Sequence, residues 1–473
     1  MKPVLLVTLA MVAGLLLRLW MLKRFFLVNG DVLIYGGIAK NLLLHGSYAL
    51  FWANGEMHST LIRLPGYPLF LALCFRLFGM ENYASVAWVQ IALELAGCLL
   101  LADFVRRIAS VGAAKWTLWL AALCPFTAIY AVEPLTESLT LFVIALALWA
   151  MARFCEQPGW KPALWFTFAV TFAALLRPDG VLVGVALTPA LVIAVWRRKH
   201  SAASKVPAGQ PRLLRMAMVC LLLALMPFAA WSWRNWQIFH VFQPLASRYA
   251  TEPDEDLHLG WKLWVKTWSL DYVSTFNVYW SVPGGPLDLS KLPSRAFDSP
   301  EQYAETAELA AIYNGRDNAI ELLPDVDARF GKLAKERIAA HPLRYYVVLP
   351  LGRMGDMWLR PRVENLYDDL DWWVYAHHPA KTLLSWACVA LNAVYLLLAI
   401  AGLWLRPRFW QPMLAYLLLR SALLMTLETP EARYTLECFP MLFVLGGIGV
   451  YEGWRRIVRP VERRHGGADG AVD

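Results

Sequence analysis

Long apolar runs separated by short polar loops dominate the pattern of this chain. A helix needs roughly 20 apolar residues to cross the hydrocarbon core of a bilayer. Runs of about this length predict membrane-spanning helices near residues 4–26, 84–105, 115–132, 136–154, 161–176, 180–197, 213–232, 382–405, 410–427 and 436–454. The pattern therefore predicts an all-α polytopic membrane protein with about 10–12 transmembrane helices.

The stretch 65–79 (PGYPLFLALCFRLFG) is apolar but too short to be a span. As a helix it would reach about 22 Å, against a hydrocarbon core of about 30 Å. We therefore expect it to lie in or dip into the interface. This choice places the basic loops on one side, where the positive-inside rule makes them cytoplasmic. Their basic residues are Arg106, Arg107, Lys115, Arg153, Lys161, Arg197, Arg198, Lys199, Lys205, Arg212, Arg215, Arg406, Arg408, Arg455, Arg456, Arg459, Arg463 and Arg464.

The remaining polar segments fall on the opposite, outer side in this topology. They are 27–83, the turns at 133–137 and 177–180, the long segment 233–381, and 428–437. Asp31, Glu137, Arg177 and Arg433 all lie in them. Scattered polar residues would not be expected to share one face so consistently, so we take this face as the candidate site.

Composition agrees with a membrane protein and narrows its function. Of the 473 residues, 58% are hydrophobic and 17% are charged, and the mean hydropathy is +0.44. Soluble domains are nearer 25% charged. The net charge of +8 comes from basic residues in short loops, which excludes a basic face for nucleic acid. The seven cysteines lie in or beside apolar runs without paired spacing, which indicates packing residues, not disulfides or a metal site.

Four segments organise the chain. Residues 1–232 form an N-terminal transmembrane module, and its first outer loop, 27–83, is the predicted catalytic loop. Residues 233–381 form a mixed periplasmic segment, with helical pieces at 303–313 and 326–340 and an amphipathic stretch at 334–357 that leads back to the bilayer. C-terminal transmembrane helices follow at 382–464, and 465–473 is predicted to be a disordered tail.

The stretch Val28–Pro68 holds the densest candidate chemistry. Asp31 lies at the start of a short amphipathic helix, and Arg63 follows about thirty residues later in the same outer loop. A carboxylate at the mouth of a helix, followed by an arginine, suggests chemistry at a lipid–water boundary; the alternative is a polar loop that only joins two spans. Asp is also favoured at the start of any helix, so a capping role for Asp31 stays open.

These residues form a recognisable series. It comprises Gly30-Asp31, Tyr35, the run Ile38–Leu43, Gly46-Ser47-Tyr48, Arg63, the run Pro65–Leu69 and Leu77-Phe78-Gly79. The series resembles the N-terminal part of GT-C glycosyltransferases, and its nearest branch resembles family 39, the superfamily of protein O-mannosyltransferases and aminoarabinose transferases. Three later pieces agree with this resemblance, namely Thr136–Leu139, His341–Tyr346 with Arg353 and Trp358, and Glu431–Tyr434 with Pro440. The long segment 233–381 also resembles uncharacterised bacterial members of the family.

The resemblance implies a GT-C fold with interfacial helices in the first outer loop. It also implies transfer of a sugar from a polyprenyl-phosphate donor, with inversion, at the periplasmic face of the bacterial inner membrane. The acceptor would be a lipid, a polysaccharide or a protein. Eukaryotic protein mannosyltransferases of this superfamily carry an Asp-Glu pair in the first loop, whereas here Val32 follows Asp31, so protein is not favoured over the other acceptors.

Roles follow from the resemblance, each beside a structural alternative. Asp31 is the general base, and Glu137 assists it or is a helix-start acid stabilised by the helix dipole. The candidates for donor-phosphate binding are Arg63, Arg433, Arg177 and Arg353, with interfacial anchoring, turn or snorkelling roles as alternatives. Tyr35, Tyr67 and Tyr434 contact substrate or only pack. No cofactor is expected and a divalent cation is not required, because His45, His58 and His341 show no metal-ligand spacing.

Two other functions remain open at this stage. A transporter or flippase of lipid-linked glycans would place charges inside its spans, and Glu94 and Arg420 are the clearest candidates. A non-catalytic subunit of an envelope glycan complex would keep the fold without the activity. Besides the donor and acceptor, membrane lipids are the expected partners.

Overall fold

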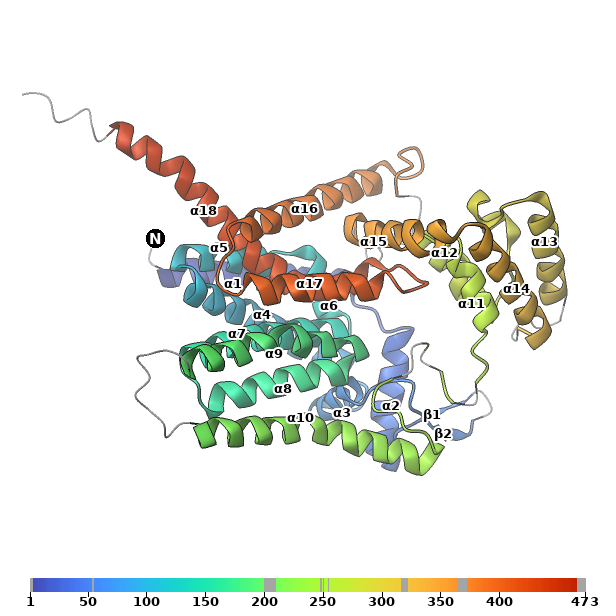
Figure 1. Ribbon diagram of the computed structural model, residues 1–473, viewed down its shortest axis with the longest axis horizontal. Helices are drawn as coiled ribbons and strands as arrows, with labels where there is room; N and C mark the ends of the chain where they lie inside the picture. Colours follow the sequence, from blue (N-terminus) through green and yellow to red (C-terminus); the bar gives the residue numbers. More distant parts are fainter. Residues whose placement is uncertain are drawn as a thin grey trace, which may run out of the picture. The chain divides into compact units, whose positions relative to one another are not determined.

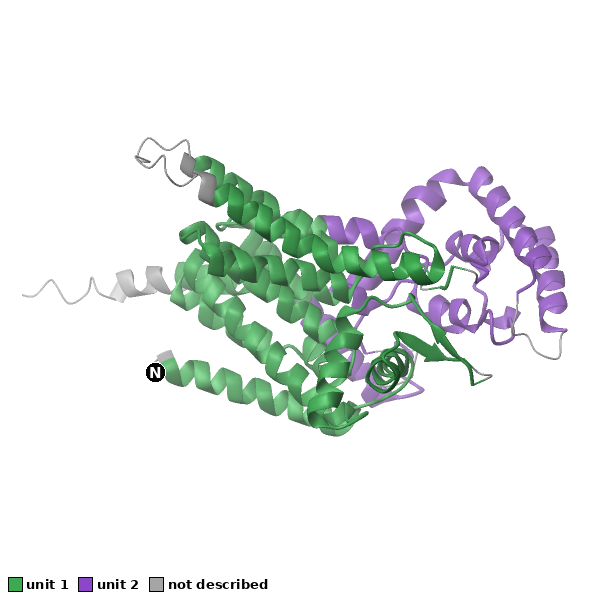
Figure 2. Cartoon of the chain, turned by 90° about the horizontal axis from the view of Figure 1, so that it is seen from below, with its two compact units in different colours: residues 1–253, 393–418, 436–473 green, residues 254–392, 419–435 purple. Residues whose placement is uncertain are grey.

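The computed structural model describes residues 3–52, 55–199, 210–246, 249, 251–253, 255–315, 322–363 and 372–465. The chain divides into two compact units (Figure 2). Unit 1 comprises Met1–Pro253, Ala393–Leu418 and Leu436–Asp473, and unit 2 comprises Asp254–Asn392 and Leu419–Thr435. The described residues contain eighteen α-helices and one two-stranded sheet, which confirms the predicted all-α fold class.

Most of the helices of unit 1 come from the N-terminal half of the chain (Figure 1). They are α1 (Pro3–Phe25), α2 (Asp31–His45), α3 (Gly66–Phe78), α4 (Tyr83–Ile108), α5 (Val111–Ala122), α6 (Pro125–Val132), α7 (Thr136–Glu156), α8 (Trp160–Leu176), α9 (Val181–Lys199) and α10 (Gln210–Phe239). The C-terminal part of the chain adds the second half of α16 (Pro379–Trp404), the start of α17 (Trp410–Leu424) and α18 (Phe439–His465).

Seven of the ten predicted spans are described helices long and apolar enough to cross a membrane. The predicted span 115–132 is two helices, α5 and α6, bent by 53°. Pro125 begins α6, and proline has no N–H with which to continue the preceding helix. The predicted spans 161–176 and 410–427 correspond to α8 and α17, which have 17 and 15 residues. The chain is therefore a multi-pass membrane protein, with seven or eight full-length spans among the described residues.

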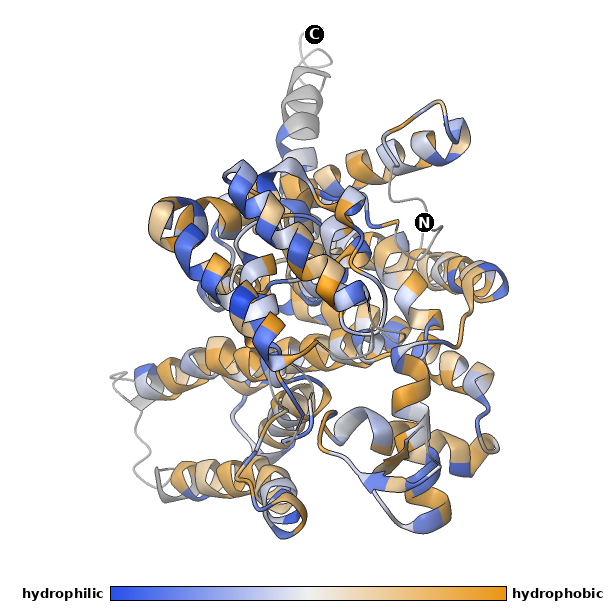
Figure 3. Cartoon of the chain, turned by 90° about the vertical axis from the view of Figure 1, so that its right-hand side faces the viewer, coloured by the Kyte–Doolittle hydropathy of each residue, from blue (hydrophilic) through white to orange (hydrophobic). Residues whose placement is uncertain are grey.

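Burial separates inner from outer helices. In the most apolar window of each span, 83% of residues are buried in α7 and 83% in the span that contains α18, but only 6% in α10. Most exposed residues of α10 are nevertheless apolar, among them Leu221, Leu222 and Met226. Apolar residues cover the long helices in Figure 3 as well. Such a surface is expected of helices that face lipid.

The first outer loop folds into α2, a hairpin and α3. Helix α2 ends at Gly46, whose φ of 64° lets its N–H donate to Leu42 O. Strands β1 (Ala49–Phe51) and β2 (Met57–Ser59) pair antiparallel, with Ala49 opposite Ser59. Asn41 Nδ2 donates to Ala49 O over 2.9 Å and ties α2 to the hairpin. Helix α3 has only 13 residues, as the stretch 65–79 predicted.

Unit 2 is built from shorter helices. They are α11 (Leu259–Lys266), α12 (Tyr272–Asn277), α13 (Pro300–Asn314), α14 (Pro324–Ala340) and α15 (Leu349–Leu359). Its core packs Trp261, Trp264 and Trp268 against Phe330 and Leu333. The predicted helical pieces 303–313 and 326–340 are confirmed as parts of α13 and α14.

The segments expected around unit 2 do not all coincide with elements or units of the structure. The amphipathic stretch 334–357 covers the last part of α14, which ends at Ala340, a π-helical turn, Arg344–Val348, and most of α15. Unit 2 begins at Asp254, not at residue 233, and includes 419–435 from beyond α16. Of the predicted tail 465–473, residues 466–473 lie outside the described part of the chain.

Candidate active site

Asp31 is the first residue of α2, and its carboxylate is held by an arginine. Gly30 takes the N-cap position with a φ of 49°, so the capping role considered for Asp31 belongs to its neighbour. Arg63 Nη2 donates to Asp31 Oδ1 over 2.8 Å. The Asp31 side chain is 37% exposed and that of Arg63 is 18% exposed. A carboxylate in this position is fixed in direction yet remains reachable from outside.

Arg63 contacts more than Asp31. Its guanidinium lies over the ring of Tyr35, 5.5 Å from the ring centroid. Its Nε is buried and has no hydrogen-bond partner among the described residues. Tyr48 Oη donates to the Arg63 carbonyl over 3.0 Å, which fixes the backbone of this loop. Arg63 therefore keeps one buried donor beside the Asp31 carboxylate.

A second charged cluster is organised around Arg177, at the C-terminal end of α8. Its Nη1 lies 3.3 Å from Glu137 Oε1, and its Nε lies 3.4 Å from Asp179 Oδ1 and 3.1 Å from Glu437 Oε1. Glu137 and Glu437 are almost fully buried. Burial of carboxylates is costly unless a cation accompanies them. Arg177 is thus a shared counter-ion for three acids from three separate segments.

Two tyrosines lie between the clusters. The rings of Tyr35 and Tyr67 meet edge to face, with centroids 5.1 Å apart. Burial raises the pKa of Tyr35 above its ordinary value; the Arg63 guanidinium opposes this shift, and Asp31, Arg177 and Glu137 also act on it. Burial and the charge of Glu137 likewise raise the pKa of Tyr67. Residues of both charged clusters therefore act on the phenol group of Tyr35.

Close backbone packing brings the two arginines toward each other. A Cβ on Gly66, three residues after Arg63, would lie 2.6 Å from Leu175 O, two residues before Arg177. Only glycine allows the start of α3 to approach the end of α8 this closely. Tyr67 Oη then donates to Gln90 Oε1 on α4 over 2.7 Å, and Gln90 Nε2 donates to Glu133 O over 2.7 Å.

Six predicted residues thus gather in unit 1: Asp31, Tyr35, Arg63, Tyr67, Glu137 and Arg177. The sequence reasoning missed Glu437, Asp179 and Gln90. Asp179 stands in the same turn as Arg177, and Glu437 closes the predicted outer segment 428–437. Both residues lie in segments that were predicted to be outer and polar, but nothing in the sequence predicted that they contact Arg177.

The other three candidates belong to unit 2 and have different surroundings. Arg353 is fully buried and donates to three backbone carbonyls, those of Ser269, Lys266 and Leu427, over 2.7–3.0 Å. Burial lowers the pKa of Arg353 to about 10. Arg353 therefore holds the backbone of these segments together. Because its donors are used in this way, we leave Arg353 out of the proposed phosphate site.

Arg433 and Tyr434 lie in the 3₁₀ helix Ala432–Cys438. Arg433 Nε is 2.6 Å from Glu431 Oε2, and Tyr434 Oη donates to the other oxygen of the same carboxylate. The Arg433 guanidinium also lies 5.5 Å from the centroid of the Tyr434 ring. Glu431 therefore holds both candidates in one local cluster.

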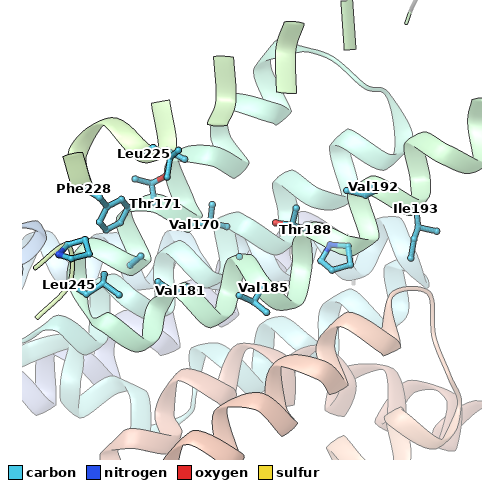
Figure 4. A pocket seen from close by; sticks show the side chains of 15 residues that line it. Val170, Thr171, Val181, Val185, Thr188, Val192, Ile193, Leu225, Phe228 and Leu245 are labelled. Atoms are coloured by element: carbon cyan, nitrogen blue, oxygen red, sulfur yellow. The ribbon is translucent and has the colours of Figure 1, made fainter. Parts of the chain in front are cut away.

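An apolar groove of about 890 Å³ runs between α8, α9 and α10 (Figure 4). Ala174 on α8 and Val181 on α9 line it, and these residues flank the turn that carries Arg177 and Asp179. Among its fifteen lining residues only Thr171 and Thr188 have polar side chains. The groove offers a hydrocarbon-lined space that begins beside a charged cluster.

The charges inside the predicted spans both bind protein groups. Arg18 Nε donates to Glu94 Oε2, and Arg18 Nη1 donates to Ala122 O over 2.7 Å. Arg420 donates to Tyr434 O through Nε and Nη2, over 3.0 and 2.8 Å. A transport path would need such charges to face a passing substrate. No observation here favours the transporter alternative.

Comparison with known proteins gives a consistent assignment. Residues 63–233 match a family model described as dolichyl-phosphate-mannose-protein mannosyltransferase. The crystal structure of the Archaeoglobus fulgidus oligosaccharyltransferase complex with Zn and sulfate is similar over 97% of this chain, with 12% identity and a TM-score of 0.50. This chain has the GT-C fold.

The solved structures that this chain resembles are of larger proteins. It spans about half of the archaeal oligosaccharyltransferase, 50% of that chain. ArnT from Cupriavidus metallidurans bound to undecaprenyl phosphate matches 96% of this chain and 77% of its own, with 16% identity and a TM-score of 0.38. No curated protein matches the sequence significantly. At 12% identity, the archaeal structure establishes the fold of this chain alone.

The residues of the GT-C chain do not fit the zinc that accompanies the archaeal structure. Among the described residues, no group of three or more His, Cys, Asp and Glu side chains is arranged to hold a metal ion. The acids Glu137, Asp179 and Glu437 instead surround the Arg177 guanidinium. A protein cation therefore already lies among these acids. The expectation that no cofactor is required remains a prediction.

Proposed function

We propose that the GT-C chain transfers a sugar from a polyprenyl-phosphate donor to an acceptor hydroxyl, at the periplasmic face of the bacterial inner membrane. The observation that carries this proposal is the half-exposed Asp31 carboxylate, held by Arg63 at the end of α2. The match of residues 63–233 to a dolichyl-phosphate-mannose mannosyltransferase model supports the donor class. The acceptor is a lipid, a polysaccharide or a protein.

Asp31 acts as general base in a single displacement. The acceptor oxygen forms a bond to the anomeric carbon while the bond from that carbon to the phosphate oxygen breaks. Asp31 takes the proton of the acceptor hydroxyl, and polyprenyl phosphate leaves with the electron pair. One displacement inverts the anomeric configuration. Glu137 pairs with Arg177 and orients this side of the site through that arginine, not as a second base.

Arg63 stabilises the leaving phosphate, whereas Arg177 is already held by three acids. Negative charge grows on that phosphate as the glycosidic bond breaks, and fixed guanidinium groups in a poorly hydrated site stabilise it strongly. The buried Nε of Arg63 supplies a donor to which no described residue is hydrogen-bonded. Tyr35, which lies under the Arg63 guanidinium, contacts the sugar or the phosphate, and the buried Tyr67 packs against Tyr35.

The apolar groove receives the prenyl chain of the donor. It begins at the turn that carries Arg177 and is lined by α8, α9 and α10 (Figure 4). A lipid-linked phosphate needs this combination, because its chain belongs in hydrocarbon and its charge at the boundary. The groove therefore determines on which side of Arg177 the phosphate arrives.

Turnover of purified protein in nanodiscs tests the proposal. Wild type and Asp31→Asn are compared on a panel of polyprenyl-phosphate sugars, with cell-envelope extract as the source of acceptor. We expect wild type to release polyprenyl phosphate and the variant to lose about 100-fold or more in rate while it still binds donor. Glu81→Gln, which removes an exposed acid of the same unit, is the matched control and should retain activity.

Two results would contradict the proposal at different levels. Equal turnover by wild type and Asp31→Asn would remove Asp31 from the mechanism. Donor binding without turnover in wild type would favour a flippase or a non-catalytic subunit. The anomeric configuration of the product, read by NMR, tests inversion separately.

A further inference from the structure

A second cavity, of about 550 Å³, lies within unit 2. Its volume is in the range of about 300–1,000 Å³ that is usual for small-ligand sites. Four segments form it: the start of α12, the loop 290–295, the end of α15, and two adjacent tryptophans. The polar and aromatic side chains that line it are Asp271, Ser274, Ser290, Lys291, Arg295, Asp356, Arg360, Trp372 and Trp373.

One side of this cleft carries a rigid acid–base pair. Arg295 Nη2 donates to Asp271 Oδ2 over 2.5 Å and lies 3.1 Å from Ser274 Oγ. Arg295 Nε donates to Trp268 O over 3.1 Å. Asp271 in turn caps α12 by accepting from the Ser274 N–H. The two charged groups are therefore fixed by backbone contacts on both sides.

A second pair occupies the other side. Arg360 lines the cleft although its side chain is only 5% exposed. Its guanidinium lies over the Tyr272 ring at 4.9 Å and 3.7 Å from Asp356 Oδ1. Asp356 Oδ2 accepts from the Tyr272 N–H over 3.2 Å. Burial of a guanidinium against an aromatic face and a carboxylate holds it in one orientation.

Aromatic and aliphatic groups complete the wall. Trp372 packs edge to face against Trp386 of α16, at 5.5 Å, and against Trp373, at 5.8 Å. Trp373 itself is 50% exposed, and Leu359 beside it in the cleft lining is 62% exposed. A half-exposed indole that is anchored by its neighbour presents a fixed apolar face.

The mixture of groups selects a class of ligand. Two carboxylates beside three cations, Lys291, Arg295 and Arg360, would weaken the binding of a simple anion such as phosphate. Peptides commonly bind by adding a strand to a sheet edge or by laying an apolar helix face in a groove. The described part of unit 2 contains no strand, and the cleft is half polar. Neither anion nor peptide uses all the groups present.

A saccharide uses them all. Each hydroxyl both donates and accepts, so a ring edge with neighbouring hydroxyls pairs with carboxylates and guanidinium groups together. The C–H face of a sugar ring is apolar and packs on an indole. We propose that this cleft of unit 2 binds a saccharide. Its assignment to the glycan part of the acceptor rests on the proposed glycosyltransferase function.

Direct binding to the full-length protein in nanodiscs tests the cleft. The probes are mannose, glucose, galactose, N-acetylglucosamine, galacturonic acid and their disaccharides, titrated without any donor, and a Ser/Thr-rich peptide as a separate arm. We expect at least one saccharide to bind wild type and to bind about tenfold more weakly to Trp373→Ala and to Lys291→Ala. Tyr346→Ala removes an exposed aromatic of the same unit outside the cleft, and should bind as wild type does.

Each other outcome overturns the assignment. It fails if no saccharide of the panel binds, if binding is unchanged in both cleft variants, or if the peptide alone binds and loses affinity in Trp373→Ala. Thermal unfolding and binding of undecaprenyl phosphate check that each variant is folded. Because no donor or turnover is needed, saccharide binding that depends on Trp373 would stand even if the transferase proposal failed.

Discussion

At the scale of single residues, neighbours decide what an arginine does. Arg63 meets one half-exposed carboxylate and an aromatic ring, and keeps a buried donor. Arg177 is surrounded by three carboxylates, and Arg353 donates to three backbone carbonyls. All three stood in the sequence as candidate phosphate ligands. The sequence identifies the residue type, but only the folded surroundings show which guanidinium has donors left for a substrate.

The acid Asp298 of unit 2 gives a prediction at this scale. Arg344 donates to both of its oxygens, over 2.6 and 2.8 Å, and Arg337 lies 3.3 Å away. Burial would raise the pKa of Asp298, but the hydrogen bonds from Arg344 and the charge of Arg337 outweigh burial and lower it. A lowered folded pKa means that the stabilisation is present above the unfolded value, near 4, and is lost as pH falls through the folded value.

We therefore expect Asp298→Asn to lower the melting temperature of the full-length protein at pH 7 by roughly 3–6 °C. The difference from wild type should shrink as the pH falls below about 4. Thermal unfolding at pH 7 and at about pH 3.5 measures both. Glu336→Gln, on the exposed side of α14, is the control. A difference that stays constant with pH would show that the Asp298 charge is not responsible.

At the scale of elements, the candidate site depends on how closely α3 approaches α8. The contact involves Gly66 at the start of α3 and the backbone of Leu175 and Leu176 at the end of α8. Gly180, in the turn after α8, is packed in the same way against Ala173 O, where a Cβ would lie at 2.1 Å. These two glycines fix the end of α8, and with it Arg177, against the loop that carries Arg63.

Gly66→Ala should therefore separate the two arginines. An added Cβ would lie 2.6 Å from Leu175 O, which is backbone and can yield only if a helix moves. Displacements of about 1 Å in a catalytic site can reduce rates by about 100-fold. We expect kcat/KM to fall by about tenfold to 100-fold with donor and acceptor present, in the turnover assay described above.

Gly159→Ala is the matched control at the opposite end of α8. A Cβ there meets nothing within 4 Å, and the glycine is not at positive φ. Its kcat/KM should equal that of wild type. If Gly66→Ala behaved in the same way, the approach of α3 to α8 would not set the geometry of the site.

At the scale of the whole molecule, the buried Arg18–Glu94 pair ties the first helix into unit 1. Only 22% of the apolar window of α1 is buried, so few apolar contacts hold this helix. Arg18 nevertheless is fully buried and bonds to Glu94 on α4 and to Ala122 O at the end of α5. A buried polar contact that joins α1, α4 and α5 therefore holds α1 in place where apolar packing is sparse.

Removal of one partner should harm the protein more than removal of both. Arg18→Met or Glu94→Met leaves a buried group without its counterpart, which costs roughly 3 kcal/mol or more, whereas the double variant Arg18→Met/Glu94→Met should recover much of the loss. Thermal unfolding in detergent of the wild type, both single variants and the double variant completes the cycle. Losses that simply add would show that the two charges do not depend on each other.

Three of the predicted outer segments meet at this scale, because Arg177 contacts both Glu137 and Glu437. At the other ends of the helices, Arg107 pairs with Glu156 over 2.6 Å, which joins two of the predicted cytoplasmic loops. Which face is periplasmic remains part of the proposed function.

The sequence by itself determined the helical membrane class, most spans and the short first-loop helix. These features depend on the length and period of apolar runs, which are local properties. It also found Asp31 and Arg63, because both lie in one recognisable stretch. Only the tertiary structure decided that Arg177 serves three acids, that Arg353 holds loops, and that a half-polar cleft exists in unit 2. Those outcomes depend on contacts between segments up to 260 residues apart, from Arg177 to Glu437, which local pattern does not encode.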